Sequence, residues 1–377
     1  MKNKKALLLL TLLGGLSLSA HADSDVNIWN WSDYIGENTI DDFGKKSGLA
    51  NPNYAVFDSN EMVEARLLSG HSGFDAVMMT SYYVPRLAKA GALQKIDHAK
   101  IPHWSGLDQV RMQKLAEVDP GNEYAYPYTE ISVGIGYNTK KIKEIFGEDY
   151  KVDSWDFLFD KKNSDKLRRC GIAVLDSPIE IISAAMHFLG KDPTSEERND
   201  YREAQKLLTD LARNVSYFHS SRYINDLASG EICAAIGYSG DILQSRSRAH
   251  KADLGFEVEF VVPKEGSVMW FDCWTVPTGA QHYDNAMKFF DYLMTPEHTA
   301  EIANEIRYPM PVTKAVPAFD EELRNNPSVI LSDELMSKMY LMRPTTAKIS
   351  RITNRVWNAM KLDSASSDGE DDANSWN

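Results

Sequence analysis

The stretch "VNIWNWSDYIGENTIDDFGKKSG", residues 26–48, contains the unit from which the predicted fold is built. Its first six residues, "VNIWNW", are apolar enough for a buried strand. "GENTIDDFGKKSG" (36–48) then has the pattern of a helix, which Gly48 can end. A strand that leads into a helix is the repeating unit of α/β domains, so this stretch predicts that class.

The alternation of strands and helices continues along the chain and begins again near residue 134. "FDAVMMT" (74–80) predicts a strand, and "VPRLAKAG" (84–91) predicts the helix after it. "GIGYN" (134–138) and "CGIAVL" (170–175) are the strands of the second series. We therefore expect two α/β lobes, each presenting the carboxyl ends of strands, where open α/β sheets bind ligands.

We expect the lobes to be assembled from non-contiguous segments. The strands in "FEVEFVVPKEG" (256–266) and "WFDCWTVP" (270–277) alternate and then become apolar, as strands that return to the first lobe would. The last residues are acidic and aperiodic, which is typical of disorder. The predicted division is residues 23–132 with 254–308 for the first lobe, 133–253 with 309–362 for the second, and 363–377 for a disordered tail.

Residues 1–22, "MKNKKALLLLTLLGGLSLSAHA", predict a cleavable secretory signal peptide. Three lysines precede an apolar run that is short for a membrane anchor, and Ala20-His21-Ala22 fits the small-x-small cleavage rule. No cysteine follows the run, so we expect no lipid anchor. The mature protein is predicted to be soluble and exported.

The formal net charge opposes two classes of partner. Loss of the signal peptide takes this charge from −13 to −16, because three lysines and no acids leave with it. Nucleic acid and anionic lipid both require basic surface, so neither is expected as a partner. The acidic balance is compatible with a cationic ligand.

Three cysteines, Cys170, Cys233 and Cys273, allow two redox arrangements. Export permits a disulfide, and both Cys170 and Cys233 precede apolar runs that adjacent strands would bring together. Cys273 would then be a free thiol. The alternative is three reduced and buried cysteines.

Aromatic and acidic residues recur together at the ends of predicted strands. The groups are Trp270 with Asp272, Trp31 with Asp33 and Tyr34, and Tyr238 with Asp241, while Glu180 begins an apolar helix. A carboxylate binds a cation, and an aromatic face contacts both the cation and its carbon chain. No Arg or Lys accompanies these groups, so the pattern predicts a site for a cation.

Asp272 carries most of this argument, because an ionised carboxylate in the middle of an apolar strand needs a partner. The other members have plainer explanations. Asp33 and Asp241 suit helix caps, Glu180 suits the positive end of a helix, and Tyr and Trp are usually core residues. The prediction therefore rests on the agreement of the set.

Enzyme motifs are weaker than this pattern. "GYSGD" (237–241) lacks the last glycine of a nucleophile elbow, and neither a P-loop nor a His-Glu-x-x-His motif occurs. The nine histidines are scattered, so we expect no metal site and no cofactor. Paired carboxylates with tryptophan also occur in glycosidases, so a secreted carbohydrate-active enzyme is the rival hypothesis. A binding protein for another ligand, such as an amino acid or a metal, is the third.

A set of motifs resembles the periplasmic polyamine-binding proteins of ABC importers, from about Val26 to Lys361. This resemblance implies two lobes of a periplasmic binding protein, joined by crossing segments, that close around putrescine, cadaverine or spermidine. It also implies delivery to a permease in the inner membrane. We expect a periplasmic monomer that is not an enzyme. The motifs are "NWSDY" (30–34), "VFDSNE" (56–61), "YNTKKIK" (137–143), "VDSWD" (152–156), "AIGYSGD" (235–241), "VPKEG" (262–266) and the "FD" of residues 271–272.

The resemblance also implies roles for individual residues. The disulfide positions of the family fall on Cys170 and Cys233, and Met342 borders the far end of the cleft. Asp241 and Asp272 are expected to hold one amine, while Glu180 and Asp33 hold others or tune the charge. The expected ligand-binding residues are Trp31, Ser32, Asp33, Tyr34, Thr80, Tyr82, Tyr83, Glu180, Tyr238, Asp241, Trp270, Asp272 and Tyr308.

The chain departs from the family pattern at positions that bear on ligand choice. Tyr238 stands where relatives often have Trp. Tyr82 and Trp270 look like residues of spermidine-type sites, whereas Asp33 and Ser177 look like residues of putrescine-type sites. The preferred polyamine therefore stays open at the level of sequence.

Overall fold

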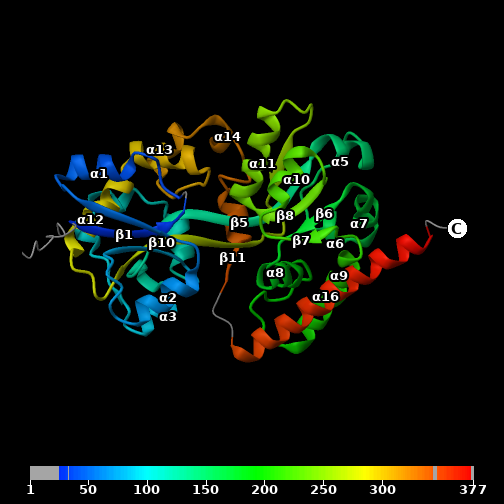
Figure 1. The fold of residues 1–377 in the computed structure, drawn as a ribbon, viewed down its shortest axis with the longest axis horizontal. Helices are drawn as coiled ribbons and strands as arrows, with labels where there is room; N and C mark the ends of the chain where they lie inside the picture. Colours follow the sequence, from blue (N-terminus) through cyan, green and yellow to red (C-terminus); the bar gives the residue numbers. More distant parts are fainter. Residues whose placement is uncertain (1–24, 33, 343–345, 375–377) are drawn as a thin grey trace, which may run out of the picture.

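The computed structural model describes residues 25–32, 34–342 and 346–374 and has the predicted α/β class. Two groups of strands and helices lie side by side, and long strands run between them (Figure 1). The hydrogen-bonded path through the strands is β2-β1-β3-β10-β5-β8-β6-β7, with β4 and β11 beside β10 and β9 beside β5. The strands are β1 (Val26–Trp31), β2 (Pro52–Phe57), β3 (Ala76–Thr80), β4 (Leu93–Gln94), β5 (Tyr126–Asn138), β6 (Ile172–Val174), β7 (Tyr217–Phe218), β8 (Ala234–Tyr238), β9 (Val258–Val261), β10 (Val268–Pro277) and β11 (Tyr340–Leu341).

The first lobe is built around β1, which lies between β2 and β3 and is parallel to both. β10 runs antiparallel to β3. The first helix ends at Gly48, whose φ of 70° is the left-handed conformation that glycine adopts without a steric penalty. The helices of this lobe are α1 (Thr39–Ser47), α2 (Asn60–Leu68), α3 (Val84–Lys89), α4 (Gln109–Leu115), α12 (Tyr283–Leu293) and α13 (Pro296–Ile306).

The second lobe is built on β6, β7 and β8, which are parallel to one another. The last helix, α16, runs along α8 and α9 on the outside of this lobe (Figure 1). Among the described residues, no helix is both long and apolar enough to cross a membrane. The helices of this lobe are α5 (Thr139–Phe146), α6 (Asp156–Phe159), α7 (Lys161–Leu167), α8 (Pro178–Phe188), α9 (Arg198–Ala212), α10 (Tyr223–Ser229), α11 (Ser239–Lys251) and α16 (Ala347–Asn374).

Three segments of the chain connect the lobes, as the resemblance implied. The first is β5, a strand of 13 residues. Residues 126–132 of β5 pair with β10, and residues 133–138 pair with β8 and β9. The chain returns between β9 and β10, and it crosses a third time between α13 and α16 (Figure 1).

An aromatic cluster fastens β5 to the core of the first lobe. Trp274 on β10 is fully buried, and its ring lies edge-on to Phe289 of α12, with 5.1 Å between ring centroids. Tyr128 of β5 packs against the same indole at 5.7 Å. Burial of an apolar side chain of this size stabilises the fold by roughly 1.5–3 kcal/mol. The crossing strand is therefore anchored by packing as well as by its backbone hydrogen bonds.

The structure differs from the sequence prediction at two places. β9 was assigned to the first lobe but pairs with the second-lobe half of β5, because alternation in a strand does not specify its partner. β2 was not predicted. α16 continues to Asn374, and the disorder expected for residues 363–377 stays a prediction. The predicted signal peptide lies outside the described residues.

One disulfide joins Cys170 to Cys233 within the second lobe, with 5.5 Å between their Cα atoms. Each cysteine precedes one of two neighbouring parallel strands, β6 and β8, whose register pairs Ile172 with Ala234. Cys273 is a free, buried thiol. The structure thus contains the disulfide that the resemblance implied.

Replacement of both half-cystines, Cys170→Ser with Cys233→Ser, is expected to lower the free energy of unfolding by about 2–4 kcal/mol. The two cysteines are 63 residues apart, so loss of the bond returns conformational entropy to the unfolded chain. Urea denaturation followed by tryptophan fluorescence would measure the change. The control is wild-type protein in a thiol reductant, which should match the double variant. Equal unfolding midpoints for oxidised and reduced protein would contradict the prediction.

Candidate functional site

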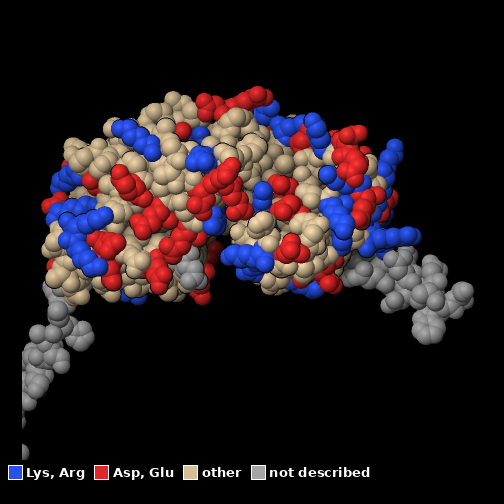
Figure 2. Space-filling view, turned by 90° about the horizontal axis from the view of Figure 1, so that it is seen from above, with Lys and Arg blue, Asp and Glu red and all other residues tan. Residues whose placement is uncertain are grey.

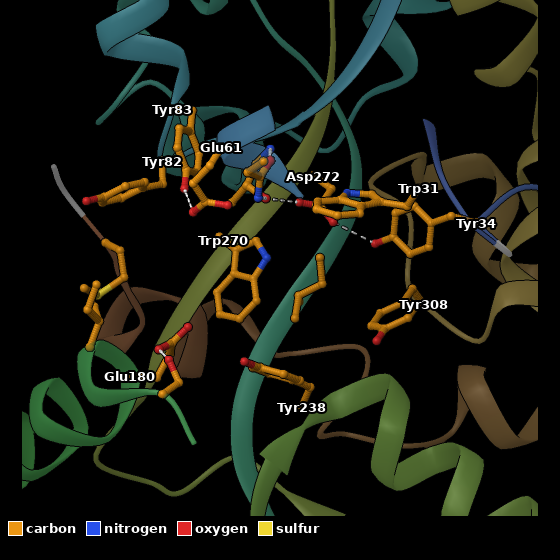
Figure 3. Close-up of a pocket in the computed structure, with 16 residues that line it drawn as sticks. Trp31, Tyr34, Glu61, Tyr82, Tyr83, Glu180, Tyr238, Trp270, Asp272 and Tyr308 are labelled. Atoms are coloured by element: carbon orange, nitrogen blue, oxygen red, sulfur yellow. Dashed lines mark hydrogen bonds between the residues drawn. The ribbon is translucent and has the colours of Figure 1, made fainter. Parts of the chain in front are cut away.

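A cavity of about 480 Å³ lies where the two lobes meet. Its side chains come from both lobes and from the crossing strands β5 and β10 (Figure 3). The volume falls within the range of small-molecule sites, about 300–1,000 Å³. The lining residues are Trp31, Tyr34, Asn60, Glu61, Thr80, Tyr82, Tyr83, Ile131, Ser177, Ile179, Glu180, Tyr238, Trp270, Asp272, Tyr308 and Met342.

Most of the predicted ligand-binding residues are brought together in this cavity. Asp33 lies outside the described residues, and Ser32 and Asp241 do not line the cavity. Met342, expected at its far end, does line it. The ten predicted residues that line the cavity are Trp31, Tyr34, Thr80, Tyr82, Tyr83, Glu180, Tyr238, Trp270, Asp272 and Tyr308. Their contact with a ligand stays a prediction.

Asp272 lies on β10, and its partners among the described residues are two hydroxyl groups and no cation. Thr80 Oγ1 donates to Asp272 Oδ1 at 2.8 Å, and Tyr34 OH donates to Asp272 Oδ2 at 3.1 Å. The residue is only 6% exposed. Burial raises the pKa of Asp272 to about 6, and the two hydrogen bonds oppose this shift. The carboxylate is therefore solvated by neutral donors, and its charge is not compensated in this site.

Each hydroxyl that contacts Asp272 is itself fixed by a further polar group. Asn60 Nδ2 donates to Thr80 Oγ1 at 3.0 Å. The hydroxyl oxygens of Thr129 and Tyr34 are 2.6 Å apart. Because the single Tyr34 proton is directed at Asp272, Thr129 must be the donor of that pair. The position of the Asp272 carboxylate is thus set by strands β3, β5 and β10, by the segment that follows β1 and by the start of α2.

Glu180 supplies a second carboxylate, half-buried, from the second lobe. It lies in the first turn of α8, and the Ser177 hydroxyl donates to its side chain. Burial raises the pKa of Glu180 above its ordinary value. Like Asp272, it has a hydroxyl as its partner and not a cation.

Aromatic rings form the walls between these carboxylates. Tyr34 and Tyr308 meet edge-on near Asp272, with 5.7 Å between ring centroids. Trp270 and Tyr238 meet at an interplanar angle of 84°, with centroids 5.6 Å apart. Trp270 lies in the middle of the cavity in Figure 3. Rings in these positions offer faces to an apolar chain or to a cation.

Asp241 is separated from Asp272, although the two were expected to hold one amine. It lies in the first turn of α11, where Tyr223 OH donates to its Oδ2 at 2.7 Å. Asp241 lines a neighbouring cavity, and Tyr308 lines both cavities. Burial raises the pKa of Asp241. The Tyr308 ring packs against Gly240 at the start of α11, so the two acids line different cavities here, and their binding of one amine stays a prediction.

Sequence reasoning missed Asn60, Glu61, Ile131 and Ile179, which also line the cavity. Asn60 and Glu61 begin α2, directly after its N-cap Ser59. The N-cap residue Ser59 in "VFDSNE" is the sequence signal that could have found Asn60 and Glu61. An N-cap fixes where a helix begins, and so it positions the two side chains that follow it. Ile131 could not be found in this way, because its place follows from its pairing with Trp270 on β10.

The charged side chains that line the described cavity are all acidic. Its described lining includes Glu61, Glu180 and Asp272 but no Lys, Arg or His. On the outer surface, acidic and basic side chains are interspersed on the face shown in Figure 2, with a notch between the two halves. The described residues contain no group of three or more His, Cys, Asp or Glu side chains placed to hold a metal ion. The cavity therefore suits an organic cation better than an anion or a metal.

A family model described as bacterial extracellular solute-binding protein matches residues 38–329. The putrescine-binding periplasmic protein of Pseudomonas aeruginosa (strain UCBPP-PA14) is 42% identical over 359 residues, covering 95% of this chain and 98% of the relative. The putrescine-binding periplasmic protein of Escherichia coli (strain K12) is 40% identical over 337 residues, covering 89% and 91%.

Solved structures show the same fold. The spermidine/putrescine ABC transporter substrate-binding protein of Streptococcus pneumoniae superposes with a TM-score of 0.80 at 21% sequence identity. The match covers 90% of this chain and 99% of that protein. At this identity the likeness establishes the two-lobed fold alone.

Replacement of Asp272 by asparagine is expected to change the stability of the ligand-free protein, relative to wild type, more favourably at pH 8 than at pH 4.5. The pKa of this carboxyl is raised from 3.8 to about 6, so wild-type stability falls as pH rises through that window, and the variant lacks this fall. Between pH 4.5 and pH 8 the difference in unfolding free energy between the two proteins should change by about 2 kcal/mol. Urea denaturation at both pH values would measure it. A difference that is independent of pH would contradict the prediction.

Proposed function

This chain belongs to the bacterial extracellular solute-binding proteins, and we propose that it captures a linear polyamine between its lobes for delivery to an ABC importer. Binding proteins of this kind close around a solute, because each lobe supplies part of the contact surface. The described cavity has this composition, with Glu180 and Tyr238 from one lobe and Tyr34 and Thr80 from the other.

The observation that carries the proposal is a cavity with carboxylates, aromatic walls and, among the described residues, no basic lining residue. A polyamine is an apolar chain with charged amines, so it needs acids for the amines and ring faces for the methylenes. An amino acid or another anion would need Arg or Lys for its carboxylate. The lining therefore favours a polyamine over the other ligand classes.

We assign Asp272 to one terminal ammonium of the ligand. Its two oxygens each accept one hydroxyl hydrogen bond and keep lone pairs for further donors. An ammonium would supply the missing positive charge, and each charge-assisted hydrogen bond contributes roughly 1.5–3 kcal/mol. Trp270, Tyr34 and Tyr308 would pack on the methylenes and the cation.

The names of the relatives support the ligand class and the transport role. Two relatives at 40–42% identity are putrescine-binding periplasmic proteins, and more distant ones are spermidine/putrescine-binding periplasmic proteins. These are transport proteins and not enzymes, so the carbohydrate-active alternative has no support among them. We further propose a periplasmic location and an inner-membrane permease as the partner. The monomeric state stays a prediction from the sequence.

Isothermal titration calorimetry of the mature chain tests the proposal, after unfolding and refolding to remove carried-over ligand. We expect micromolar or tighter binding of putrescine, cadaverine or spermidine and no heat from glutamate. Asp272→Asn should weaken binding about tenfold or more through loss of a charge-assisted contact. Asp284→Asn is the control, since this exposed residue of α12 pairs with Lys100 outside the cavity. Folded protein without heat from any polyamine would overturn the proposal.

Polyamine affinity is expected to rise with pH between pH 5 and pH 7. Asp272 has a pKa of about 6 in the empty cavity, and only its ionised form attracts an ammonium, so protonation competes with the ligand. The apparent affinity should fall about tenfold or more from pH 7 to pH 5, because Glu180 also has a raised pKa. Titrations at several pH values would show the slope. Asp272→Asn should flatten it, and an equal slope in both proteins would exclude Asp272 as its source.

A further inference from the structure

Glu61 lines the cavity but has no role in the site described above. It belongs to the "VFDSNE" motif (56–61) and lies in the first turn of α2. Ser59 is the N-cap of this helix and accepts a hydrogen bond from Met62 N at 3.4 Å. The cap fixes the start of the helix, and thereby the direction in which Glu61 points.

The carboxylate of Glu61 is held by two hydroxyl groups. Tyr83 OH donates to Glu61 Oε1 at 2.7 Å, and Ser59 Oγ donates to Glu61 Oε2 at 2.8 Å. No Lys, Arg or His side chain of the described residues forms an ion pair with it. Arg86 lies 5.8 Å from the centre of the Tyr83 ring, but its guanidinium pairs with Glu64. Glu61 is therefore positioned without being neutralised.

The acids of the cavity occupy two ends. Asp272 lies with Tyr34 and Tyr308 at one end, whereas Glu61 and Glu180 lie toward the end marked by Tyr82 (Figure 3). Glu61 comes from α2 of the first lobe and Glu180 from α8 of the second. The hydrogen bonds from Tyr83 and Ser59 lower the pKa of Glu61, so it is charged where Asp272 and Glu180 still hold protons.

The cavity also has more room than a four-carbon diamine fills. At about 30 Å³ for each heavy atom, the volume share of a liquid water, six heavy atoms occupy roughly 180 Å³. The cavity measures about 480 Å³. A triamine of ten heavy atoms would fill roughly 300 Å³ on the same scale, and it would extend from Asp272 past Trp270 toward Glu61.

We propose that Glu61 is a specificity-determining residue that binds, together with Glu180, the distal amine of a polyamine longer than putrescine. This inference rests on the proposed polyamine function. One amine lies at Asp272, and the second contact joins α2 of one lobe to α8 of the other. On this assignment a short diamine held at Asp272 leaves Glu61 without a ligand contact, whereas a triamine such as spermidine contacts both acids.

Calorimetry with wild type, Glu61→Gln and Glu301→Gln tests this assignment, using putrescine, spermidine and 1,8-diaminooctane. Glu301 is the matched control, because it carries the same charge on α13 of the first lobe and lies outside the cavity. Glu61→Gln should weaken spermidine and 1,8-diaminooctane about fivefold or more, and putrescine less than twofold. Tyr83→Phe, which removes one donor to Glu61 but keeps the charge, should give a smaller loss with the same dependence on ligand length.

The outcomes separate this inference from the proposed function. If wild type binds no polyamine, the proposed function fails and the inference fails with it. If wild type binds putrescine and Glu61→Gln weakens all three ligands equally, or matches Glu301→Gln, the function stands and the role of Glu61 is overturned. Tight binding of putrescine with no binding of either longer amine would overturn it as well.

Discussion

The antiparallel pairing of β5 with β10 is the constraint on which the site depends. β5 is long enough to pair with β10 in the first lobe and with β8 in the second. This register places Asp272 opposite Thr129, Trp270 opposite Ile131, and Tyr238 opposite Val133. Side chains from three paired strands therefore meet in one cavity, and sites built on strands hold their geometry more precisely than sites built on loops.

The same pairing explains why the cavity tolerates an uncompensated acid. Asp272 lies among strands whose hydroxyl groups can solvate it, and none of the described residues that line the cavity is a lysine or arginine. Neutral donors reduce the cost of burial but do not remove it, as the raised pKa of Asp272 shows. A protein that kept this carboxylate only for stability would gain by replacing it. Burial of the charged Asp272 carboxylate lowers the stability of the empty protein, and a bound cation would offset this loss.

The sequence predicted individual strands and helices well, but it predicted contacts between residues far apart in the chain less well. β1 matches the predicted strand at 26–31, and the aromatic residues of all three predicted strand-end groups line one cavity, although Asp272 is the only acid of those groups that the structure places there among the described residues. Partners far apart in sequence, such as Thr80 and Asp272, could not be derived from periodicity, because a strand pattern does not name its neighbour. Glu61 was missed because its position comes from a polar helix cap and from a hydrogen bond donated by Tyr83, which lies 22 residues further along the chain. The Tyr308 ring between Asp241 and Asp272 is a packing detail that no residue pattern encodes.

The number of crossings between the lobes has a mechanical consequence. The chain begins in the first lobe with β1 and ends in the second with α16, so it must pass between them an odd number of times. One connection would let the lobes swivel freely, but three neighbouring connections share one bending axis and resist torsion. The lobes can then approach and separate by a hinge rotation about this axis. The two sets of cavity side chains therefore meet in the same alignment at every closure.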